Sequence, residues 1–460
     1  MDRIGWRWLV AVFAIAFAVY AVSPVHQNYD SYLAFPTAQS VVHDGNLTLN
    51  EFDSPLFETH GWMSVTETGR EINTYPWVPS LFLIPSVIAL DVADAIGIGP
   101  GSYAVANGGR GMDTIQQLSA SVVVALVVVM VFAISFRRLD PTQTVKRRRA
   151  TAAVVTFGFA FGTAAWSTAS RAMWQHGPSL LFLAIAVYCG QLLLTETEAD
   201  GPRLKWIAMF LGAAVAASFT CRPTNAIAVI AFSVFVVFRL RKFLRRYLAG
   251  AFVVAVPWLM VNTVTYDSVL PHYYSAGKVG LHDDYGLALA TNLVSPARGL
   301  LLFSPIVVLG IFGIVERNRT TIKSGLLTFD RLLLGMSLGY LLASSGLSDN
   351  WWAGRSFGPR FMSDTLVFFA ATATPTVAVL MQRRTAATVV AITLLAWSVL
   401  VNAQGGAMRS TLCWNEAPNI DTHTSRLWDF EHSQMLSGLQ AVADDGIADA
   451  ILTRCTPDGG

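Results

Sequence analysis

The chain has 460 residues, of which 53% are hydrophobic and only 13% are charged. Because an ordinary soluble domain carries about 25% charged residues, this composition excludes a water-soluble protein as the main part of the chain. The net charge of +2, with no basic tail and no nucleic-acid motif, argues against a nucleic-acid partner. Four cysteines in so long a chain also exclude a disulfide-rich scaffold.

Apolar stretches recur along the chain and predict an all-α polytopic membrane protein. Stretches of about 16 or more largely apolar residues approach the length that a helix needs to cross a hydrocarbon core about 30 Å thick. We expect eleven transmembrane helices, near residues 6–24, 117–136, 150–169, 178–195, 205–220, 223–238, 247–264, 299–315, 331–347, 364–381 and 386–403. A further apolar stretch at 79–90 is short and contains Pro85, so we expect an interfacial or re-entrant helix there.

The basic residues orient these spans. If the N-terminus is cytoplasmic, 21 of the 32 Lys and Arg residues fall at the cytoplasmic ends of the spans, as the positive-inside rule favours. If residues 79–90 crossed the membrane, the basic clusters at 137–149 and 239–246 would face outward. We therefore predict a multi-pass protein of the cytoplasmic (inner) membrane with an exoplasmic C-terminus.

This topology divides the chain into four parts. They are a first transmembrane helix at 1–24, a large exoplasmic loop with interfacial helices at 25–116, a bundle of ten helices at 117–403 that includes an exoplasmic loop at 265–298, and an exoplasmic tail at 404–460. Cys413 and Cys455 both lie in the tail, so a disulfide bond between them is plausible in an oxidising compartment. Cys189 and Cys221 lie within or at the edge of spans, where apolar packing is expected.

Asp30 lies just beyond the first span, at the boundary between lipid and water. Because partial desolvation makes a carboxylate a stronger base, Asp30 is a candidate for proton transfer. The alternative is structural, since an Asp at this position can cap a helix over residues 31–42.

Arginine side chains lie at other outer edges of the predicted bundle. Arg171 and His176 share one short loop that suits an anion, although a single histidine at a membrane edge is more often structural. Arg222 joins two spans almost without a loop, where it costs about a few kcal/mol unless it snorkels or meets a counter-charge. In the segment 349–360, Gly and Pro interrupt a basic loop, as expected of a backbone folded around a phosphate. The arginines predicted to hold the phosphate of a polyprenyl lipid are Arg171, Arg222, Arg298 and Arg360.

Taken in order, these motifs resemble the GT-C superfamily of membrane glycosyltransferases. The closer resemblance is to bacterial proteins of the dolichyl-phosphate-mannose and aminoarabinose transferase type. The segments that carry it are 28–30 with 36–38, 174–178, 295–300 with 304–305, 352–360, and 425–430.

The resemblance implies a polyprenyl-phosphate-linked sugar as donor and a glycan, lipid or protein acceptor at the outer membrane face. It makes Asp30 the general base of an inverting transfer and gives the leaving phosphate to Arg222, Arg298 and Arg360, with Arg171 and His176 as further contacts. The family's frequent Asp-Glu pair is absent, because Ser31 follows Asp30. This departure leaves other acidic residues of the first loop as rivals for the role of base, namely Glu51 and Asp53.

Further substrate contacts are expected from Glu51, Asp53, Lys278, Trp352 and Arg355. The Asp-x-Asp metal signature of the oligosaccharyltransferase branch is missing from the first loop, so neither a metal nor another cofactor is expected. Two other functions stay open. A transporter or flippase for lipid-linked glycans would show internal repeats and charges at span centres, and an O-antigen-ligase-like enzyme would carry its main loop late in the chain.

Overall fold

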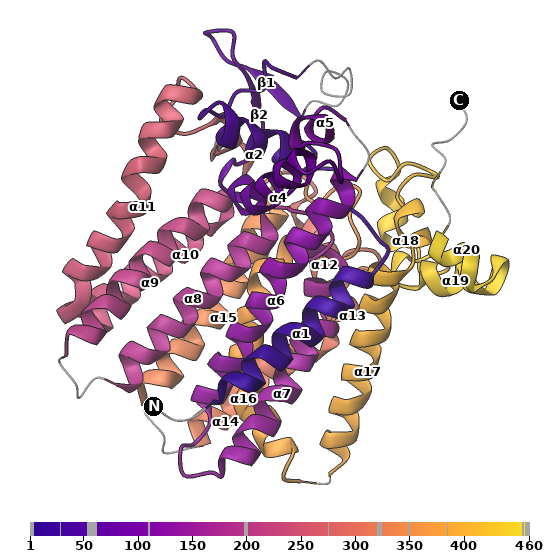
Figure 1. Ribbon diagram of the computed structural model, residues 1–460. Helices are drawn as coiled ribbons and strands as arrows, with labels where there is room; N and C mark the ends of the chain where they lie inside the picture. Colours follow the sequence, from indigo (N-terminus) through magenta and orange to yellow (C-terminus); the bar gives the residue numbers. More distant parts are fainter. Residues whose placement is uncertain are drawn as a thin grey trace.

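A computed structural model describes residues 4–27, 29–52, 62–108, 111–196, 201–274, 276–319, 324–347, 350–383, 385–452 and 455. The long helices run side by side in one bundle, and the short helices of the first loop cover one end of it together with a small hairpin (Figure 1). The N-terminus lies at the opposite end of the bundle (Figure 1).

A helix overlaps each of the eleven predicted spans, although several helices begin or end a few residues outside them. These helices are α1 (Trp6–Val22), α6 (Met112–Arg138), α7 (Val145–Phe161), α8 (His176–Thr195), α9 (Pro202–Cys221), α10 (Ala226–Arg239), α11 (Leu244–Thr265), α14 (Val308–Arg319), α15 (Ser324–Ser345), α16 (Leu366–Leu380) and α17 (Ala386–Ala407). Within the described ranges, eight helical segments are long and apolar enough to cross a membrane, which indicates a multi-pass membrane protein. The number of crossings and their orientation stay predictions.

Large apolar side chains cover the outside of this bundle as well as its interior. Phe252 and Met260 on α11 and Val389 and Ile392 on α17 are all exposed. A helix that is apolar on its outer face fits an apolar solvent rather than water.

Glycines allow the closest helix contacts. A Cβ atom on Gly212 of α9 would collide with the carbonyl oxygen of Tyr247, and one on Gly250 of α11 would collide with that of Met209. Small residues that let two backbones approach are typical of helix packing in membranes. This reciprocal contact attaches α11, whose outer face is otherwise exposed, to the rest of the bundle.

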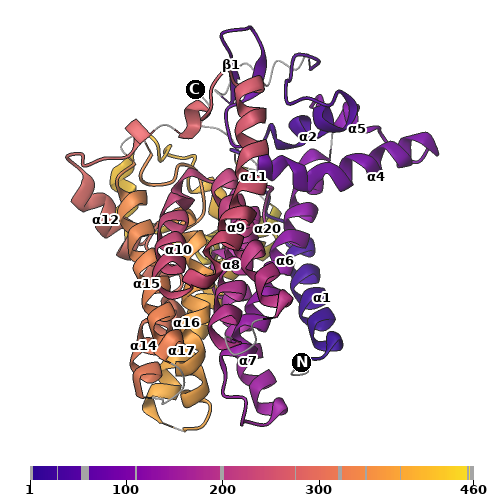
Figure 2. The same ribbon diagram turned by 90° about the vertical axis from the view of Figure 1, so that its left-hand side faces the viewer.

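The first loop forms a layer over one end of the bundle. Its elements are α2 (Ala34–His43), β1 (Met63–Val65), β2 (Glu71–Asn73), η1 (Val78–Leu83), α4 (Ile84–Ala95) and α5 (Ser102–Ala106). The strands are antiparallel, with Ser64 opposite Ile72. The segment η1–α4 is one of the eight that could span a membrane by length and composition, but Figure 2 shows α4 lying across the direction of the long helices, as a helix at a membrane surface would.

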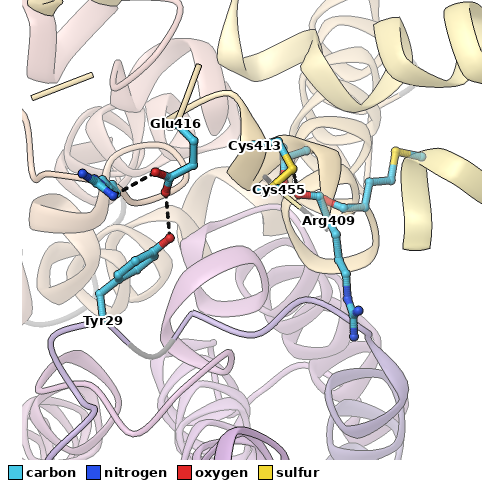
Figure 3. The surroundings of a disulfide bond; sticks show 8 residues. Tyr29, Arg409, Cys413, Glu416 and Cys455 are labelled. Atoms are coloured by element: carbon cyan, nitrogen blue, oxygen red, sulfur yellow. Dashed lines mark hydrogen bonds and ion pairs between the residues drawn. A yellow bond between two sulfur atoms is a disulfide. The ribbon is translucent and has the colours of Figure 1, made fainter. Parts of the chain in front are cut away.

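The remaining elements are short and lie between or after the long helices. They are η2 (Ala165–Ala169, π-helical), η3 (Pro223–Asn225), η4 (Arg241–Phe243), η5 (His272–Tyr274), η6 (Ala276–Lys278), α12 (Tyr285–Val294), α13 (Leu300–Phe303), η7 (Pro305–Val307), η8 (Arg360–Thr365), α18 (Ser410–Cys413), η9 (Thr424–Trp428), η10 (Gln434–Leu436), α19 (Ser437–Asp445) and α20 (Ile447–Leu452). The predicted disulfide bond between Cys413 and Cys455 is confirmed, with Cα atoms 4.9 Å apart (Figure 3). Cys189 and Cys221 are free and buried, as expected.

Candidate functional site

Asp30 and Arg360 form an ion pair at the end of the bundle that the first loop covers. Nη1 of Arg360 lies 2.6 Å from Oδ2 of Asp30, although the two residues are 330 positions apart in the chain. Arg360 is the first residue of η8, which leads into α16. The Arg360 side chain is 5% exposed and that of Asp30 is 25% exposed, so one face of the carboxylate is open.

Asp30 does not cap a helix. The helix that follows it, α2, begins at Ala34 with Leu33 in the capping position and without a side-chain cap. The structural alternative for Asp30 is therefore wrong, because its carboxylate is used by partners far away in the sequence.

Aromatic side chains surround the ion pair. The hydroxyl of Tyr75 donates a hydrogen bond of 3.2 Å to Oδ1 of Asp30, and its ring lies 5.2 Å from that of Tyr273. The guanidinium of Arg360 lies 4.5 Å from the ring centre of Trp174, within the range of a cation–π interaction. Burial and the neighbouring Asp30 carboxylate raise the pKa of Tyr75, so the hydroxyl stays protonated and keeps its role as a donor.

A second ion pair, between Arg222 and Asp364, lies deeper in the protein. The two side chains are 6% and 0% exposed. The other carboxylate oxygen of Asp364 accepts a hydrogen bond of 2.7 Å from Ser179, which in turn accepts one of 2.7 Å from Asn225. Arg222 therefore has a buried counter-charge and does not need to snorkel. Sequence reasoning missed Asp364, although an acid at the start of a predicted span is a recognised signal of a functional or paired group.

The two ion pairs share the short helix η8, which carries both Arg360 and Asp364. Burial raises the pKa of Tyr273 and Asp30 raises it further, whereas the hydrogen bond from Gln175 and the charges of Arg222 and Arg360 act in the opposite direction. The ring of Tyr273 lies 5.2 Å from that of Tyr75, which binds Asp30. The structure thus brings together the predicted base and two of its predicted phosphate ligands.

His176 and Lys278 lie at the margins of the same site. His176, the first residue of α8, is buried with its ring 6.0 Å from Trp174, and Arg222 and Arg360 both act on it electrostatically. The Nζ of Lys278 lies 5.8 Å from the ring centre of Tyr273. Among the residues that the structure describes, no ion-pair partner of Lys278 is present.

The contacts of Arg298 differ from those predicted, because its guanidinium donates hydrogen bonds to groups of the protein itself. Its guanidinium donates to the carbonyl oxygens of Trp352 at 2.7 Å, Ala297 at 2.9 Å and Gly354 at 2.8 Å, and also to the side chains of Asn415 and Gln434. The side chain is fully buried. These contacts favour a structural role in place of the predicted phosphate contact.

Arg171 is held by the fold in the same way. Its guanidinium donates to the carbonyl oxygens of Tyr20 and Ser23 at 2.6 and 3.1 Å and to the hydroxyl of Ser170. It therefore ties the end of α1 to the segment after η2. The sequence places an arginine near the membrane plane, but it does not say in which direction the guanidinium points.

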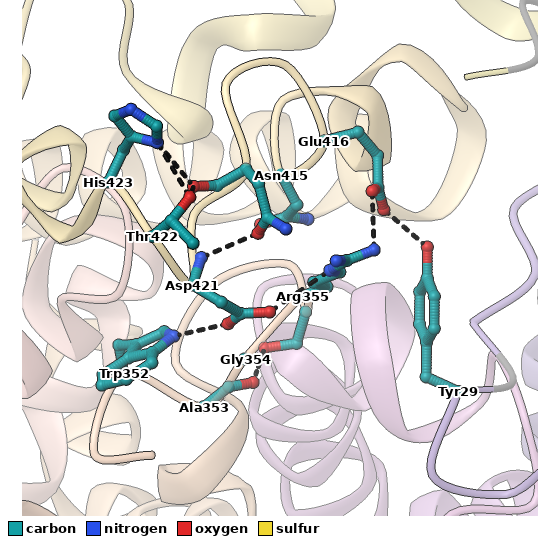
Figure 4. Close-up of polar contacts among 12 residues, drawn as sticks. Tyr29, Trp352, Ala353, Gly354, Arg355, Asn415, Glu416, Asp421, Thr422 and His423 are labelled. Carbon is teal, nitrogen blue, oxygen red and sulfur yellow. Dashed lines mark hydrogen bonds and ion pairs between the residues drawn. The ribbon is translucent and has the colours of Figure 1, made fainter. Parts of the chain in front are cut away.

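The other predicted substrate contacts fall into two groups. Arg355 forms ion pairs with Glu416 at 2.8 Å and Asp421 at 3.2 Å, and the indole of Trp352 donates to Asp421 at 2.9 Å (Figure 4). Glu51 accepts a hydrogen bond from Ser40 of α2, so it serves the first loop and gains no support as a rival base. Asp53, the other rival, lies outside the described residues.

No group of three or more His, Cys, Asp or Glu side chains within the described part of the chain is placed to hold a metal ion. Metal independence stays a prediction.

Comparisons with known proteins bear on the fold. No protein-family model and no curated protein sequence matches the chain. The structure is similar to the crystal structure of the Archaeoglobus fulgidus oligosaccharyltransferase tethered through a disulfide bond to an acceptor peptide containing an NVT sequon, with a TM-score of 0.53 and 11% sequence identity. The match covers 92% of this chain but only 59% of the oligosaccharyltransferase chain. At this identity the likeness shows a shared fold.

Proposed function

We propose that the chain is a membrane glycosyltransferase of the GT-C type, similar to the bacterial dolichyl-phosphate-mannose and aminoarabinose transferases. It moves a sugar from a polyprenyl-phosphate-linked donor to a hydroxyl of a glycan, lipid or protein at the outer face of the cytoplasmic membrane. The observation that carries the proposal is the partly open ion pair of Asp30 with Arg360. The fold shared with an oligosaccharyltransferase supports the class of reaction.

In this proposal Asp30 is the general base. Its Oδ2 takes the proton from the acceptor hydroxyl, the hydroxyl oxygen bonds to the anomeric carbon with inversion, and the bond from that carbon to the phosphate oxygen breaks. Oδ2 accepts a hydrogen bond from Arg360. A donor phosphate competes for the same guanidinium, so donor binding frees Oδ2 for the proton while Tyr75 still holds Oδ1.

The charges of the site indicate which residues stabilise the leaving phosphate. Asp30 balances Arg360, and Asp364 balances Arg222. A bound phosphate adds negative charge that neither pair offsets, and Lys278 beside Tyr273 is placed to supply the missing positive charge. Fixed cations aimed at the charge that develops on a leaving group are often the largest catalytic contribution.

The test combines lipid analysis with one substitution. Mass spectrometry of lipid that copurifies with the protein should find a polyprenyl-phosphate-linked sugar. In proteoliposomes with that lipid, Asp30→Asn should slow the release of polyprenyl phosphate by about 10²- to 10⁴-fold, the usual contribution of a general base, while lipid retention is unchanged.

The matched control is Asp44→Asn, because Asp44 is an exposed carboxylate of the same loop. Its rate should equal that of the wild type. Transfer at the wild-type rate by Asp30→Asn would remove the base from the mechanism. Retained lipid with no transfer by any variant would favour the carrier or flippase alternative.

A further inference from the structure

The C-terminal tail contacts both chain segments that carry the Asp30–Arg360 pair. Tyr29 donates a hydrogen bond of 2.8 Å to Oε1 of Glu416, and Arg355 donates one of 2.8 Å to Oε2 (Figures 3 and 4). Tyr29 directly precedes Asp30, and Arg355 lies in the loop that leads to Arg360. One carboxylate therefore joins the two segments on which the proposed reaction depends.

The loop before Arg360 has a backbone that needs such support. Ala353 has a φ of 67°, in the left-handed region that residues other than glycine rarely adopt. A second tail residue, Gln434, also holds this loop, since its amide donates to the carbonyl oxygen of Ser356 at 2.9 Å and its side-chain oxygen accepts from the amide of Gly358 at 3.0 Å. Backbone strain of this kind persists where the surroundings hold it.

The tail is itself fixed near Glu416. Cys413, three residues before Glu416, is bonded to Cys455. Arg409 donates a hydrogen bond of 3.1 Å to the carbonyl oxygen of Pro24, just after α1 and six residues before Asp30. In Figure 3 the Arg409 side chain points away from Glu416, so the tail contacts the first segment at two separate places.

From these contacts we infer that Glu416 is a positioning residue. It holds Tyr29–Asp30 against the Arg355–Arg360 loop, so the distance between base and guanidinium depends on the tail. An effect of Glu416 on sugar transfer rests on the proposed function. The coupling of the two segments through Glu416 does not depend on it. The opposing view is that this is an ordinary surface ion pair with little energetic value; Glu416, at 13% exposed, is better shielded than that view requires.

Asp421 provides a matched control for the experiment. It also binds Arg355, at 3.2 Å, but its other hydrogen bond comes from Trp352 and not from Tyr29 (Figure 4). Removing Asp421 thus weakens one segment, and removing Glu416 releases both.

The test is amide hydrogen exchange of the full-length protein in nanodiscs, followed over residues 29–34 and 355–361. Glu416→Ala should speed exchange in both segments by about tenfold, the effect of losing a hydrogen bond to a charged group. Asp421→Ala should leave residues 29–34 at the wild-type rate. Tyr29→Phe combined with Glu416→Ala should give no further change at 29–34, because both substitutions break the same bond. Glu416→Gln should restore most of the protection, since its oxygen accepts from Arg355 and its amide donates to the Tyr29 hydroxyl.

Unchanged exchange at 29–34 in Glu416→Ala would overturn the inference. In the transfer assay, Glu416→Ala should lower kcat about tenfold with KM changed less than about twofold, as for an interaction that matters in the transition state. If Asp30→Asn keeps full activity while Glu416→Ala still loosens both segments, the proposed function fails and the coupling stands. If Asp30→Asn is inactive and Glu416→Ala loosens neither segment, only the coupling fails.

Discussion

The two arginine–aspartate pairs of the site use the same chemical groups in different surroundings. The Arg222–Asp364 pair is closed, with Asp364 fully buried and bonded to Ser179. The Arg360–Asp30 pair is partly open, with a quarter of the Asp30 side chain exposed and aromatic rings as neighbours. A closed pair cannot exchange its partner for a substrate without leaving a buried charge unpaired, whereas an open pair can.

The difference also separates stability from activity. Replacing one member of a buried ion pair leaves an uncompensated charge, which costs about 3–5 kcal/mol. Arg360 is as buried as Arg222, but the Asp30 side chain is partly exposed, so water can reach the place of that carboxylate and reduce the loss. We therefore expect the closed pair to maintain the fold and the open pair to carry the chemistry.

The largest expected effect is the loss of protein stability when the closed pair is broken. Asp364→Ala should lower the free energy of unfolding by about 3–5 kcal/mol, because it leaves the Arg222 guanidinium buried without a counter-charge. Thermal unfolding in detergent measures the change. The double variant Arg222→Met with Asp364→Leu should recover most of the loss. Asp30→Ala should cost less than Asp364→Ala, because water can reach the place of the Asp30 carboxylate. Equal losses for Asp364→Ala and Asp30→Ala would show that the two pairs do not differ in this way.

Arg298 extends the comparison to an arginine whose guanidinium donors are all bound to oxygens of the protein itself. Lysine offers three donors on a flexible chain and cannot reproduce the planar fork of arginine. Arg298→Lys should therefore lose several buried hydrogen bonds and about 2–3 kcal/mol of stability. Binding of undecaprenyl phosphate, measured with the folded variant, should not change. Weakened binding without a loss of stability would restore the phosphate role that the sequence predicted.

Lys278 tests the open side of the site. Lys278→Ala should weaken the binding of undecaprenyl phosphate about tenfold, the value of roughly one charge-assisted hydrogen bond. Stability should change by less than about 0.5 kcal/mol, as for most surface substitutions. The control is Lys205→Ala, an exposed lysine at the start of α9. If both lysine variants bind equally well, the charge at Lys278 plays no part in holding the donor.

Much of the fold follows from the sequence. The apolar runs predicted a helix that overlaps each span. Two cysteines in a tail expected to face an oxidising compartment predicted the Cys413–Cys455 bond. The sequence also predicted that Asp30, Arg222 and Arg360 lie at one end of the bundle, and the two ion pairs are joined there through η8, which carries Arg360 and Asp364. These features depend on hydropathy and on depth in the membrane, which are properties of the sequence.

The parts that sequence reasoning missed depend on direction and on distant partners. Arg298 and Arg171 have the expected depth but point toward carbonyl groups. The fold is needed to recognise Asp364 as the counter-charge of Arg222, because η8 packs beside α8 only in three dimensions. The same holds for Glu416, whose contact with Tyr29 joins the tail to the first loop. The residues of the Arg222–Asp364 contact are 142 positions apart and those of the Tyr29–Glu416 contact are 387 apart, so no local sequence pattern predicts either contact.

The smallest effect expected concerns the hydrogen bond that orients the open carboxylate. Tyr75→Phe keeps the ring against Tyr273 but removes the donor to Oδ1 of Asp30. The loss is about 0.5–1.5 kcal/mol, so transfer should slow by about tenfold or less while lipid retention and thermal stability stay near the wild type. Tyr103→Phe is the control, because that hydroxyl donates to the backbone of Glu51 instead. A slower reaction in Tyr75→Phe and a normal one in Tyr103→Phe would show that the exposed face of Asp30 works only when its other oxygen is held, whereas equal rates would mean that Arg360 alone orients the base.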